Sequence, residues 1–199
     1  ANRARLQQIS GESRHQGIVA EIVRSSVLDE AGLRTLVENH LSGESSRSLL
    51  LLVLDGIQDP HNLGACLRTA EAAGVHAVGA AGLGPTVSKV AAGAAECLPF
   101  ASVPNLGRVL GWLDEYGVRC VATSDVADRS LYDCDLTGPL ALVMGREESG
   151  ISKGVLKRCH VQVSLPMQGS VSSLNVSVAS GVCLYETLRQ RSAEKSASD

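Results

Sequence analysis

The chain has 199 residues, of which 44% are hydrophobic, and its formal net charge is −3 at pH 7. This length and composition are typical of one globular domain with at most a small appendage, and they exclude a disordered chain. The longest apolar run, residues 49–54, is far shorter than the roughly 20 residues of a membrane-spanning helix, and the sequence shows no signal-peptide pattern. We therefore expect a cytoplasmic protein with no membrane contact.

The cysteines and the aromatic residues narrow the possible ligands. The cysteines stand singly among apolar residues, with no C-x-x-C pair and no Cys/His spacing, so we expect reduced core residues and no metal site. Only five residues are aromatic: one Phe, one Trp and three Tyr. With a negative net charge, a nucleic-acid site would have to be local or shared with another chain. The six cysteines are Cys66, Cys97, Cys120, Cys134, Cys159 and Cys183.

In chain order, a basic start is followed by alternating strands and helices. Residues 1–16 hold Arg3, Arg5 and Arg14 among few apolar residues, which predicts a basic linker. A strand is expected at 17–23 and a helix at 29–41, with Asp29 as its N-cap. Further strands are expected at about 49–54, 76–80, 98–103, 118–123, 140–144 and 160–165, and helices at about 61–73, 86–95, 104–116, 152–158 and 175–191.

This alternation of apolar strands and helices predicts an α/β fold with a mostly parallel sheet covered by helices on both faces. Ligands of such sheets bind at the C-terminal ends of the strands. A dinucleotide is not favoured, because the G-x-G at residues 82–84 is too short and residues 145–150 lack the middle glycine of the fingerprint. A P-loop is absent from the sequence as well.

The first polar constellation lies in residues 54–74, LDGIQDPHNLGACLRTAEAAG. Its helix begins after a turn at Asp59, and helical spacing places Arg68 on a stripe of otherwise small side chains. An arginine surrounded by alanine and glycine suits a site that a bulky anion approaches. The alternative is structural, with Asn62 as an N-cap and Arg68 paired with Glu71 on the surface.

Two further constellations follow the last two strands. Gly145 ends one strand in the sequence LVMGREESG, where a glycine lets a ligand reach the backbone, although an ordinary strand-to-helix turn fits equally well. The segment LPMQGSVSSLN, residues 165–175, follows the other strand and carries more hydroxyl and amide groups than one helix cap needs. A serine-rich cap on a buried helix is the alternative interpretation of this segment.

Taken together, three segments resemble the three ordered motifs of the SpoU (TrmH-type) RNA ribose 2′-O-methyltransferases of the SPOUT class. In chain order they are N-x-G-x-x-x-R, L-V-M-G-x-E-x-x-G and L-P-M-x-G-x-x-S-S-L-N-V-S-V-A. The resemblance runs from about residue 15 to residue 191. It implies a deep trefoil knot at the C-terminal end of the sheet, an otherwise very rare topology. It also implies that S-adenosylmethionine binds beside Thr123, Ser124, Met144, Gly145, Leu165, Met167 and Leu174.

The same resemblance implies a homodimer that methylates a ribose 2′-hydroxyl of RNA. The chain most resembles the family members that act on a guanosine in the peptidyl-transferase region of 23S rRNA. This similarity lies in HQGIVAE at residues 15–21 and in the intact MQGSVSSLNVSVASG segment. The residues that match the family's catalytic positions are Arg68, Asn62, Glu147, Ser173 and Asn175. A tRNA substrate, a catalytically idle RNA-binding assembly module and a nucleotide-dependent oxidoreductase are the alternatives.

The family also bears on how the chain is divided. Its full-length members carry a small RNA-binding domain before a linker. We therefore expect residues 1–16 to be that linker, residues 17–199 to be the methyltransferase domain, and the RNA-binding domain to be absent from this chain. On that expectation, the chain alone binds the cofactor and dimerises but methylates RNA poorly.

Overall fold

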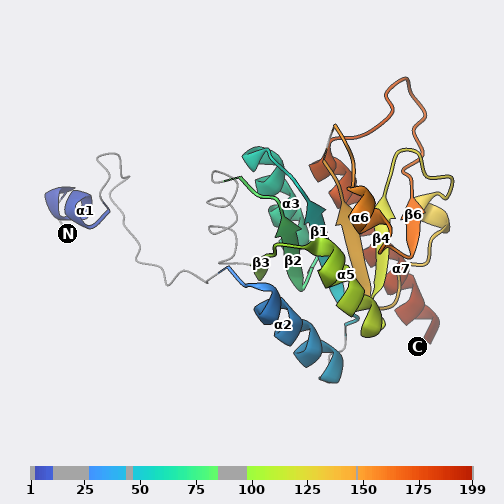
Figure 1. Cartoon of the computed structure of the whole chain (residues 1–199), viewed down its shortest axis with the longest axis horizontal. Coiled ribbons are helices and arrows are strands. Elements are labelled where there is room, and N and C mark those ends of the chain that lie inside the picture. The colour runs from blue at the N-terminus through green and yellow to red at the C-terminus, as the bar shows by residue number, and fades with distance from the viewer. Residues whose placement is uncertain (1–2, 11–26, 44–46, 85–97, 147, 199) are drawn as a thin grey trace.

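The computed structural model describes residues 3–10, 27–43, 47–84, 98–146 and 148–198 (Figure 1). The strand expected at 17–23, the helix expected at 86–95, Cys97 and Glu147 lie outside these residues. The parts of the other predicted strands and helices that fall within the described ranges are compared with the structure below.

The described strands form one parallel sheet in the order β3-β2-β1-β5-β4-β6. The predicted mostly parallel α/β sheet is therefore confirmed. β3 and β6 are the edge strands and are shorter than predicted. Leu28 forms a single bridge to Ala101 of β3, and Ser130 forms one to Ser164, just after β6. The strands are β1 (Leu50–Asp55), β2 (Ala77–Ala81), β3 (Phe100–Ser102), β4 (Arg119–Thr123), β5 (Leu140–Met144) and β6 (Val161–Val163).

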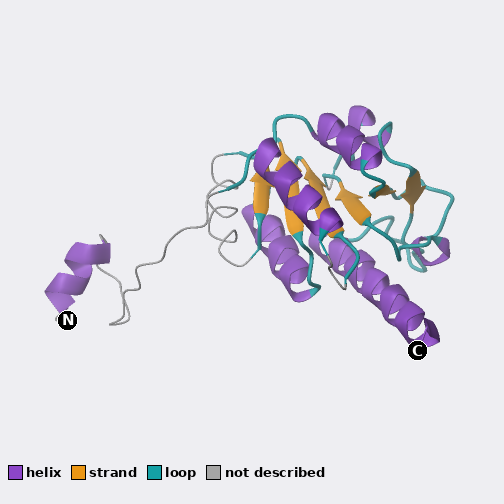
Figure 2. Cartoon of the chain, turned by 90° about the horizontal axis from the view of Figure 1, so that it is seen from below, coloured by secondary structure: helices purple, strands orange, loops and turns teal. Residues whose placement is uncertain are grey.

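Helices cover both faces of this sheet, as Figures 1 and 2 show. Successive side chains of a strand point to opposite faces. In β1, Leu50, Leu52 and Leu54 accordingly pack in the core with α3 (Pro60–Ala72) and α7 (Val176–Ser198). Leu51 and Val53 pack in a second core with α2 (Glu30–Ser42), α5 (Leu106–Glu115) and α6 (Lys153–Leu156). The uninterrupted apolar run of β1 follows from this burial on both faces.

The N-terminal segment contains a helix that was not predicted. Residues 3–10 form helix α1 (Arg3–Ser10). The segment RARLQQIS holds arginine, glutamine, alanine and leucine, which all have high helix propensity. The assignment of residues 1–16 as a linker stays a prediction.

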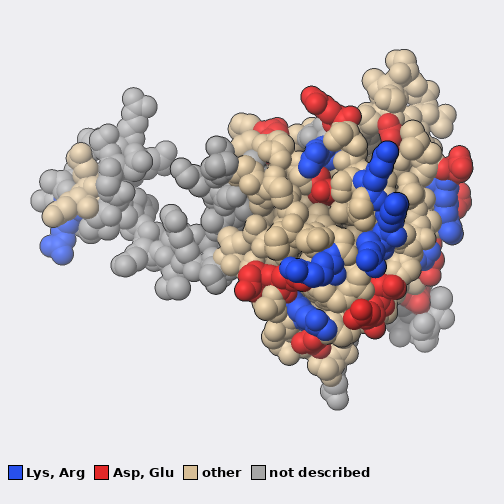
Figure 3. Space-filling model, in the orientation of Figure 1, with Lys and Arg blue, Asp and Glu red and all other residues tan. Residues whose placement is uncertain are grey.

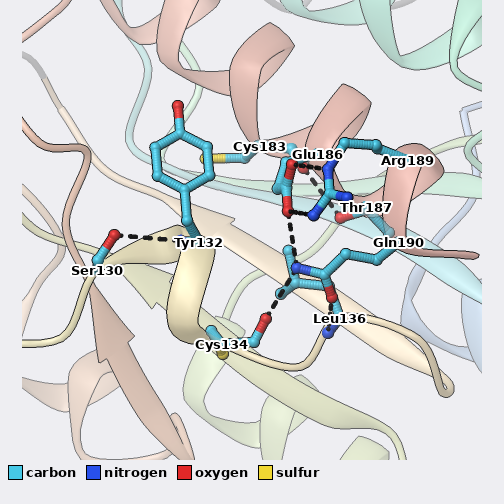
Figure 4. Close-up of polar contacts among 9 residues, drawn as sticks. All are labelled: Ser130, Tyr132, Cys134, Leu136, Cys183, Glu186, Thr187, Arg189 and Gln190. Carbon is cyan, nitrogen blue, oxygen red and sulfur yellow. Dashed lines mark hydrogen bonds and ion pairs between the residues drawn. The ribbon is translucent and has the colours of Figure 1, made fainter. Parts of the chain in front are cut away.

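Helix α7 extends beyond the predicted end at 191 and is fixed to the segment that connects β4 to β5 (Figure 4). Gln190 donates a hydrogen bond to the carbonyl oxygen of Cys134 (3.0 Å) and accepts one from the amide of Leu136 (2.8 Å). Gln190 also donates to the buried carboxylate of Glu186, which forms an ion pair with Arg189. Hydrogen bonding from Arg189 lowers the pKa of Glu186. These contacts fix the C-terminal half of α7 to the connection between β4 and β5.

Candidate functional site

A cavity of about 390 Å³ opens at the C-terminal ends of β4, β5 and β6. Three loops enclose it, and each follows one of these strands: residues 124–126, residues 145–151 and residues 165–174. The volume lies within the range of roughly 300–1,000 Å³ that is typical of small-molecule sites. The cavity is therefore where the sequence placed the ligand, at the ends of neighbouring parallel strands.

All six residues that the sequence assigned to cofactor binding line this one cavity. Thr123 and Met144 lie where β4 and β5 end, and the Thr123 hydroxyl is hydrogen-bonded to the carbonyl oxygen of Val143 (3.2 Å) and lies 3.4 Å from the Met144 sulfur. This contact ties the two strand ends together. The six are Thr123, Met144, Gly145, Leu165, Met167 and Leu174, and Ser124 and Ser173 line the cavity with them. Their role as cofactor ligands stays a prediction.

Gly145 is required by the backbone of its own loop. A Cβ atom at this position would lie 2.3 Å from the carbonyl carbon of Gly150 and 2.4 Å from the amide nitrogen of Ile151. The loop folds back on itself through two hydrogen bonds, from the amide of Arg146 to the carbonyl oxygen of Gly150 (3.1 Å) and from the amide of Gly150 to the carbonyl oxygen of Arg146 (3.0 Å). The sequence singled out the right glycine, but the close approach that the structure shows is backbone to backbone.

The segment 165–174 leaves its polar groups available to a ligand. None of these residues forms a hydrogen bond with any part of the chain that the structure describes. Most of these residues are exposed, so water can pair their backbone groups until a ligand displaces it. Apolar side chains of Leu165, Met167 and Leu174 line the cavity beside these unpaired groups. This combination fits a ligand with an apolar body and several hydrogen-bonding edges, such as an adenosine.

Asn175, which stands in the chain between the cavity residues Leu174 and Val176, is hydrogen-bonded to Asn62 of α3. Asn175 precedes α7 and caps it, since its side-chain oxygen accepts from the amide (2.9 Å) and the hydroxyl (2.6 Å) of Ser177. Its side-chain nitrogen donates to the side-chain oxygen of Asn62 on α3 (3.0 Å). The two structural alternatives are therefore wrong in detail. Asp59, not Asn62, is the N-cap of α3, and the serines of 170–173 take no part in capping α7.

Arg68 does not line the cavity of its own chain. It is exposed on α3, six residues beyond Asn62, which corresponds to roughly 9 Å along a helix axis. Within the described residues it forms no ion pair and no side-chain hydrogen bond, so the expected surface pair with Glu71 is not present. Its guanidinium is free to meet an anion or a second protein chain.

Several cavity residues were not predicted from the sequence. Asp125 and Val126 come from the loop after β4, and Ile151 and Ser172 from the other two loops. Val126 is 82% exposed although it lies at the cavity. The sequence offered one signal for the first pair, a polar turn immediately after a predicted strand, at the same sheet edge as the two loops that were chosen.

Three of the described cysteines have strongly raised thiol pKa values. Burial raises the pKa of the thiols of Cys120, Cys159 and Cys183 to about 12, as expected for core cysteines. Within the described residues, no cluster of three or more His, Cys, Asp or Glu side chains is placed to hold a metal ion. None of the helices in the described ranges is long and apolar enough to cross a membrane.

Comparison with known proteins gives one consistent group of matches. The profile of the SpoU rRNA Methylase family matches residues 49–185. The 23S rRNA (guanosine-2′-O-)-methyltransferase RlmB of Ralstonia nicotianae is 50% identical over 197 residues, covering 96% of this chain and 76% of the relative. The enzyme of the same name from Pseudomonas aeruginosa is 52% identical over 185 residues, covering 90% of this chain and 73% of the relative.

Solved structures agree with these sequence matches. The SpoU methyltransferase AviRb of Streptomyces viridochromogenes, in complex with the cofactor AdoMet, is 31% identical and superposes with a TM-score of 0.67. The similar region covers 75% of this chain and 63% of that chain. The TrmH/SpoU tRNA modifying enzyme of A. aeolicus is 27% identical with a TM-score of 0.66, covering 82% of this chain and 85% of that chain.

Proposed function

Because the chain belongs to the SpoU rRNA methylase family, we propose that it methylates a ribose 2′-hydroxyl of RNA with S-adenosylmethionine. The relatives of about 50% identity are named for a guanosine of 23S rRNA, and we propose the same substrate here. The observation that carries this proposal is the single cavity that joins all six predicted cofactor residues. We place the reaction in the cytoplasm, where ribosomal RNA is assembled in bacteria.

The cavity supplies the binding and the orientation that this chemistry needs. When bound, S-adenosylmethionine provides a methyl group on a positively charged sulfur, ready for transfer to a nucleophile. Gly145, Leu165 and Leu174 would hold its adenosine part through backbone groups, and Thr123, Met144 and Met167 would close the cavity around it. The unpaired backbone of 165–174 supports this assignment, because it offers donors and acceptors without breaking existing hydrogen bonds.

Arg68 is the proposed catalytic residue on the RNA side. As the hydroxyl oxygen bonds to the methyl carbon, its proton leaves and the carbon–sulfur bond breaks, so negative charge develops on the oxygen during the transfer. Arginine stays protonated in proteins and is a poor base. We therefore assign Arg68 to clamping a neighbouring phosphate and stabilising the developing alkoxide, a role worth about 3–4 kcal/mol in comparable sites. Glu147 is the carboxylate that would orient Arg68 or accept the proton through water.

A homodimer would place Arg68 where it can act. Arg68 is absent from the cavity of its own chain, and α7 exposes Val178 (52%) and Tyr185 (53%), which lie seven residues apart on one helix face. Leu174 (38%) extends this apolar strip towards the cavity. Closed two-fold dimers bury such self-complementary patches. We propose that two chains associate through this strip of α7 and that each supplies Arg68 to the cavity of the other.

A deep trefoil knot is also proposed for the C-terminal part. The segment between β4 and β5 is hydrogen-bonded to Ser164, just after β6, at Arg129 and Leu131, and to Gln190 of α7 at Cys134 and Leu136. Contacts with the chain both before and after the 165–174 segment support threading of α7 past this connection. Stretching the unfolded chain from both ends in an optical trap tests the knot, since a knotted chain reaches less than its full length of about 3.3–3.6 Å per residue.

Two assays test the proposed activity. Methyl transfer from radiolabelled S-adenosylmethionine to 23S rRNA and to tRNA measures the substrate directly, and no transfer to either RNA would leave the idle binding module as the better interpretation. Arg68→Ala should keep the dissociation constant for S-adenosylmethionine within about twofold but reduce methyl transfer at least 100-fold, as for the loss of one transition-state donor. Lost cofactor binding in this variant would mean that Arg68 is structural.

Mixed dimers test whether Arg68 acts across the interface. Arg68→Ala chains keep an intact cavity, and Gly145→Ala chains keep the arginine. If Arg68 acts in the partner's site, random mixing of the two inactive variants should restore about a quarter of the wild-type activity, because half of the two-fold dimers then hold one complete site. If Arg68 acts in its own chain, the mixture stays inactive. Sedimentation should show a particle of twice the chain mass of 20.7 kDa.

A further inference from the structure

A second, larger hollow adjoins the cofactor cavity on the other face of the sheet. Its volume is about 860 Å³, and it is bounded by α2, α5, α6 and the C-terminal ends of β1 and β2. Arg146 lines both this hollow and the cofactor cavity, so the two are adjacent at that side chain. The guanidinium of Arg146 lies over Gly56, where a Cβ atom would be 2.2 Å from its Nε atom. We call the second hollow the α5–α6 groove.

The α5–α6 groove contains two exposed guanidinium groups that can bind an external acceptor. Arg146 and Arg158 line it, and neither forms an ion pair or a side-chain hydrogen bond within the described part of the chain. Trp112 also lines the groove, although its indole Nε1 is buried. The two guanidinium groups would suit a ligand rich in oxygen acceptors.

The charge around this groove is positive on the α6 side. Lys153, Lys157 and Arg158 fall within residues 151–162, a stretch without Asp or Glu. Lysine and arginine side chains gather over α6 and beside α5 in Figure 3. This local excess of cations contrasts with the negative net charge of the whole chain. It would attract phosphate groups without requiring a basic protein.

The carboxylates that line the groove leave this excess in place. Glu30 is neutralised by Arg108 through hydrogen bonds of 2.6–3.0 Å. Asp55 accepts a hydrogen bond of 2.7 Å from the amide of Ser152 and is buried. Glu115 is exposed at the C-terminal end of α5.

We propose that the α5–α6 groove binds the ribose–phosphate backbone of the RNA next to the methylated nucleotide. The inference rests on the proposed function and specifies where the substrate continues beyond the cofactor cavity. Arg146, at the junction, would contact a phosphate close to the reacting ribose, and Arg158 one further along the chain. Phosphate contacts of this kind set the position of the RNA on the protein, while they read no base.

The test compares charge removal inside and outside the groove. Arg146→Gln/Arg158→Gln removes both unpaired arginines of the groove. Arg119→Gln removes one charge at the start of β4, at the opposite ends of the strands, where the Arg119 side chain donates a hydrogen bond to the carbonyl oxygen of Asp135 (2.7 Å). Binding is measured by fluorescence anisotropy with a labelled fragment of 23S rRNA that the wild-type chain methylates, at saturating S-adenosylmethionine and several salt concentrations.

The double variant should bind this RNA roughly tenfold more weakly at about 0.15 M salt. The magnitude of the slope of the logarithm of the association constant against the logarithm of the salt concentration should fall by about 0.7 for each lost phosphate contact. Arg119→Gln should bind like the wild type. The single variant Arg158→Gln should bind S-adenosylmethionine as the wild type does. Because Trp112 is the only tryptophan, its emission should also change when RNA binds.

Wild-type affinity and salt slope in the double variant would overturn the inference, and the proposed function would stand as long as the wild type still methylates RNA. An equal loss of affinity in Arg119→Gln would also overturn it, because the effect would then be one of net charge. A wild-type chain that neither binds nor methylates RNA would instead refute the proposed function.

Discussion

Gly145→Ala tests the assignment of the cavity most directly, because the structure gives the reason for its effect. The added methyl group would lie 2.3–2.6 Å from three backbone atoms of Gly150 and Ile151, and backbone at that distance has to move. Separating residues 145 and 150 breaks the two hydrogen bonds that close the loop. Each is worth about 1 kcal/mol, and forcing one methyl group into a packed site adds about 1–3 kcal/mol.

We therefore expect the free energy of unfolding to fall by about 3–5 kcal/mol and the melting temperature by about 6–20 °C. The loop lines the cavity, so the affinity for S-adenosylmethionine should fall at least tenfold. Calorimetry measures the first effect by thermal unfolding and the second by cofactor titration. Gly154→Ala is the matched control, since nothing lies within 4 Å of a Cβ atom there and α6 accommodates alanine. Wild-type stability and affinity in Gly145→Ala would refute the reasoning.

Two further predictions concern Asn175, before α7, and His76, before β2. Asn175→Ala removes the cap of α7 and the bond to Asn62, so the free energy of unfolding should fall by about 1–2 kcal/mol in urea titrations; an unchanged midpoint would contradict the capping role. Burial and the neighbouring His40 lower the pKa of His76 to about 4, while its Nδ1 accepts from the amide of Leu50. The unfolded chain then binds more protons below pH 6.5, so stability should be full above that pH and decline towards pH 4. Replacing His76 by Gln should flatten this decline, and an equally steep one would assign it to other groups.

The sequence predicted the elements that carry the cavity because their signals are local. An apolar strand that ends in glycine or hydroxyl residues identifies both its direction and its C-terminal end, which placed the loops after Met144 and Leu165 at one sheet edge, whereas Thr123 was named only through the family resemblance. The strand order was not predicted, because it depends on contacts between segments that lie far apart in the sequence. Cap assignments were less reliable, since Asp59 and Asn62 are three residues apart and both are good caps.

The residues of the α5–α6 groove could not be predicted, because the groove forms between helices that are brought together only in the folded chain. Arg146 and Arg158 are ordinary surface residues in the sequence, and only the folded chain shows that both line one groove with Trp112. The same holds for Arg34 and Arg108, which line it as well but are occupied by Glu38 and Glu30. The sequence shows which residues are charged, whereas the pairing of these charges depends on the tertiary structure.

The separation of the cavity from Arg68 follows from the strand order. The cavity belongs to the half of the sheet formed by β5, β4 and β6, whereas α3 follows β1 and packs on α7. Helix α3 contributes no residue to the cavity lining that the structure describes, and Arg68 lies six residues beyond Asn62, which is hydrogen-bonded to Asn175. In the proposed dimer, one chain would bind the methyl donor with its own residues, and Arg68 of the second chain would complete the reaction. Cofactor affinity should accordingly be independent of protein concentration, while the specific activity should fall as the dimer dissociates on dilution.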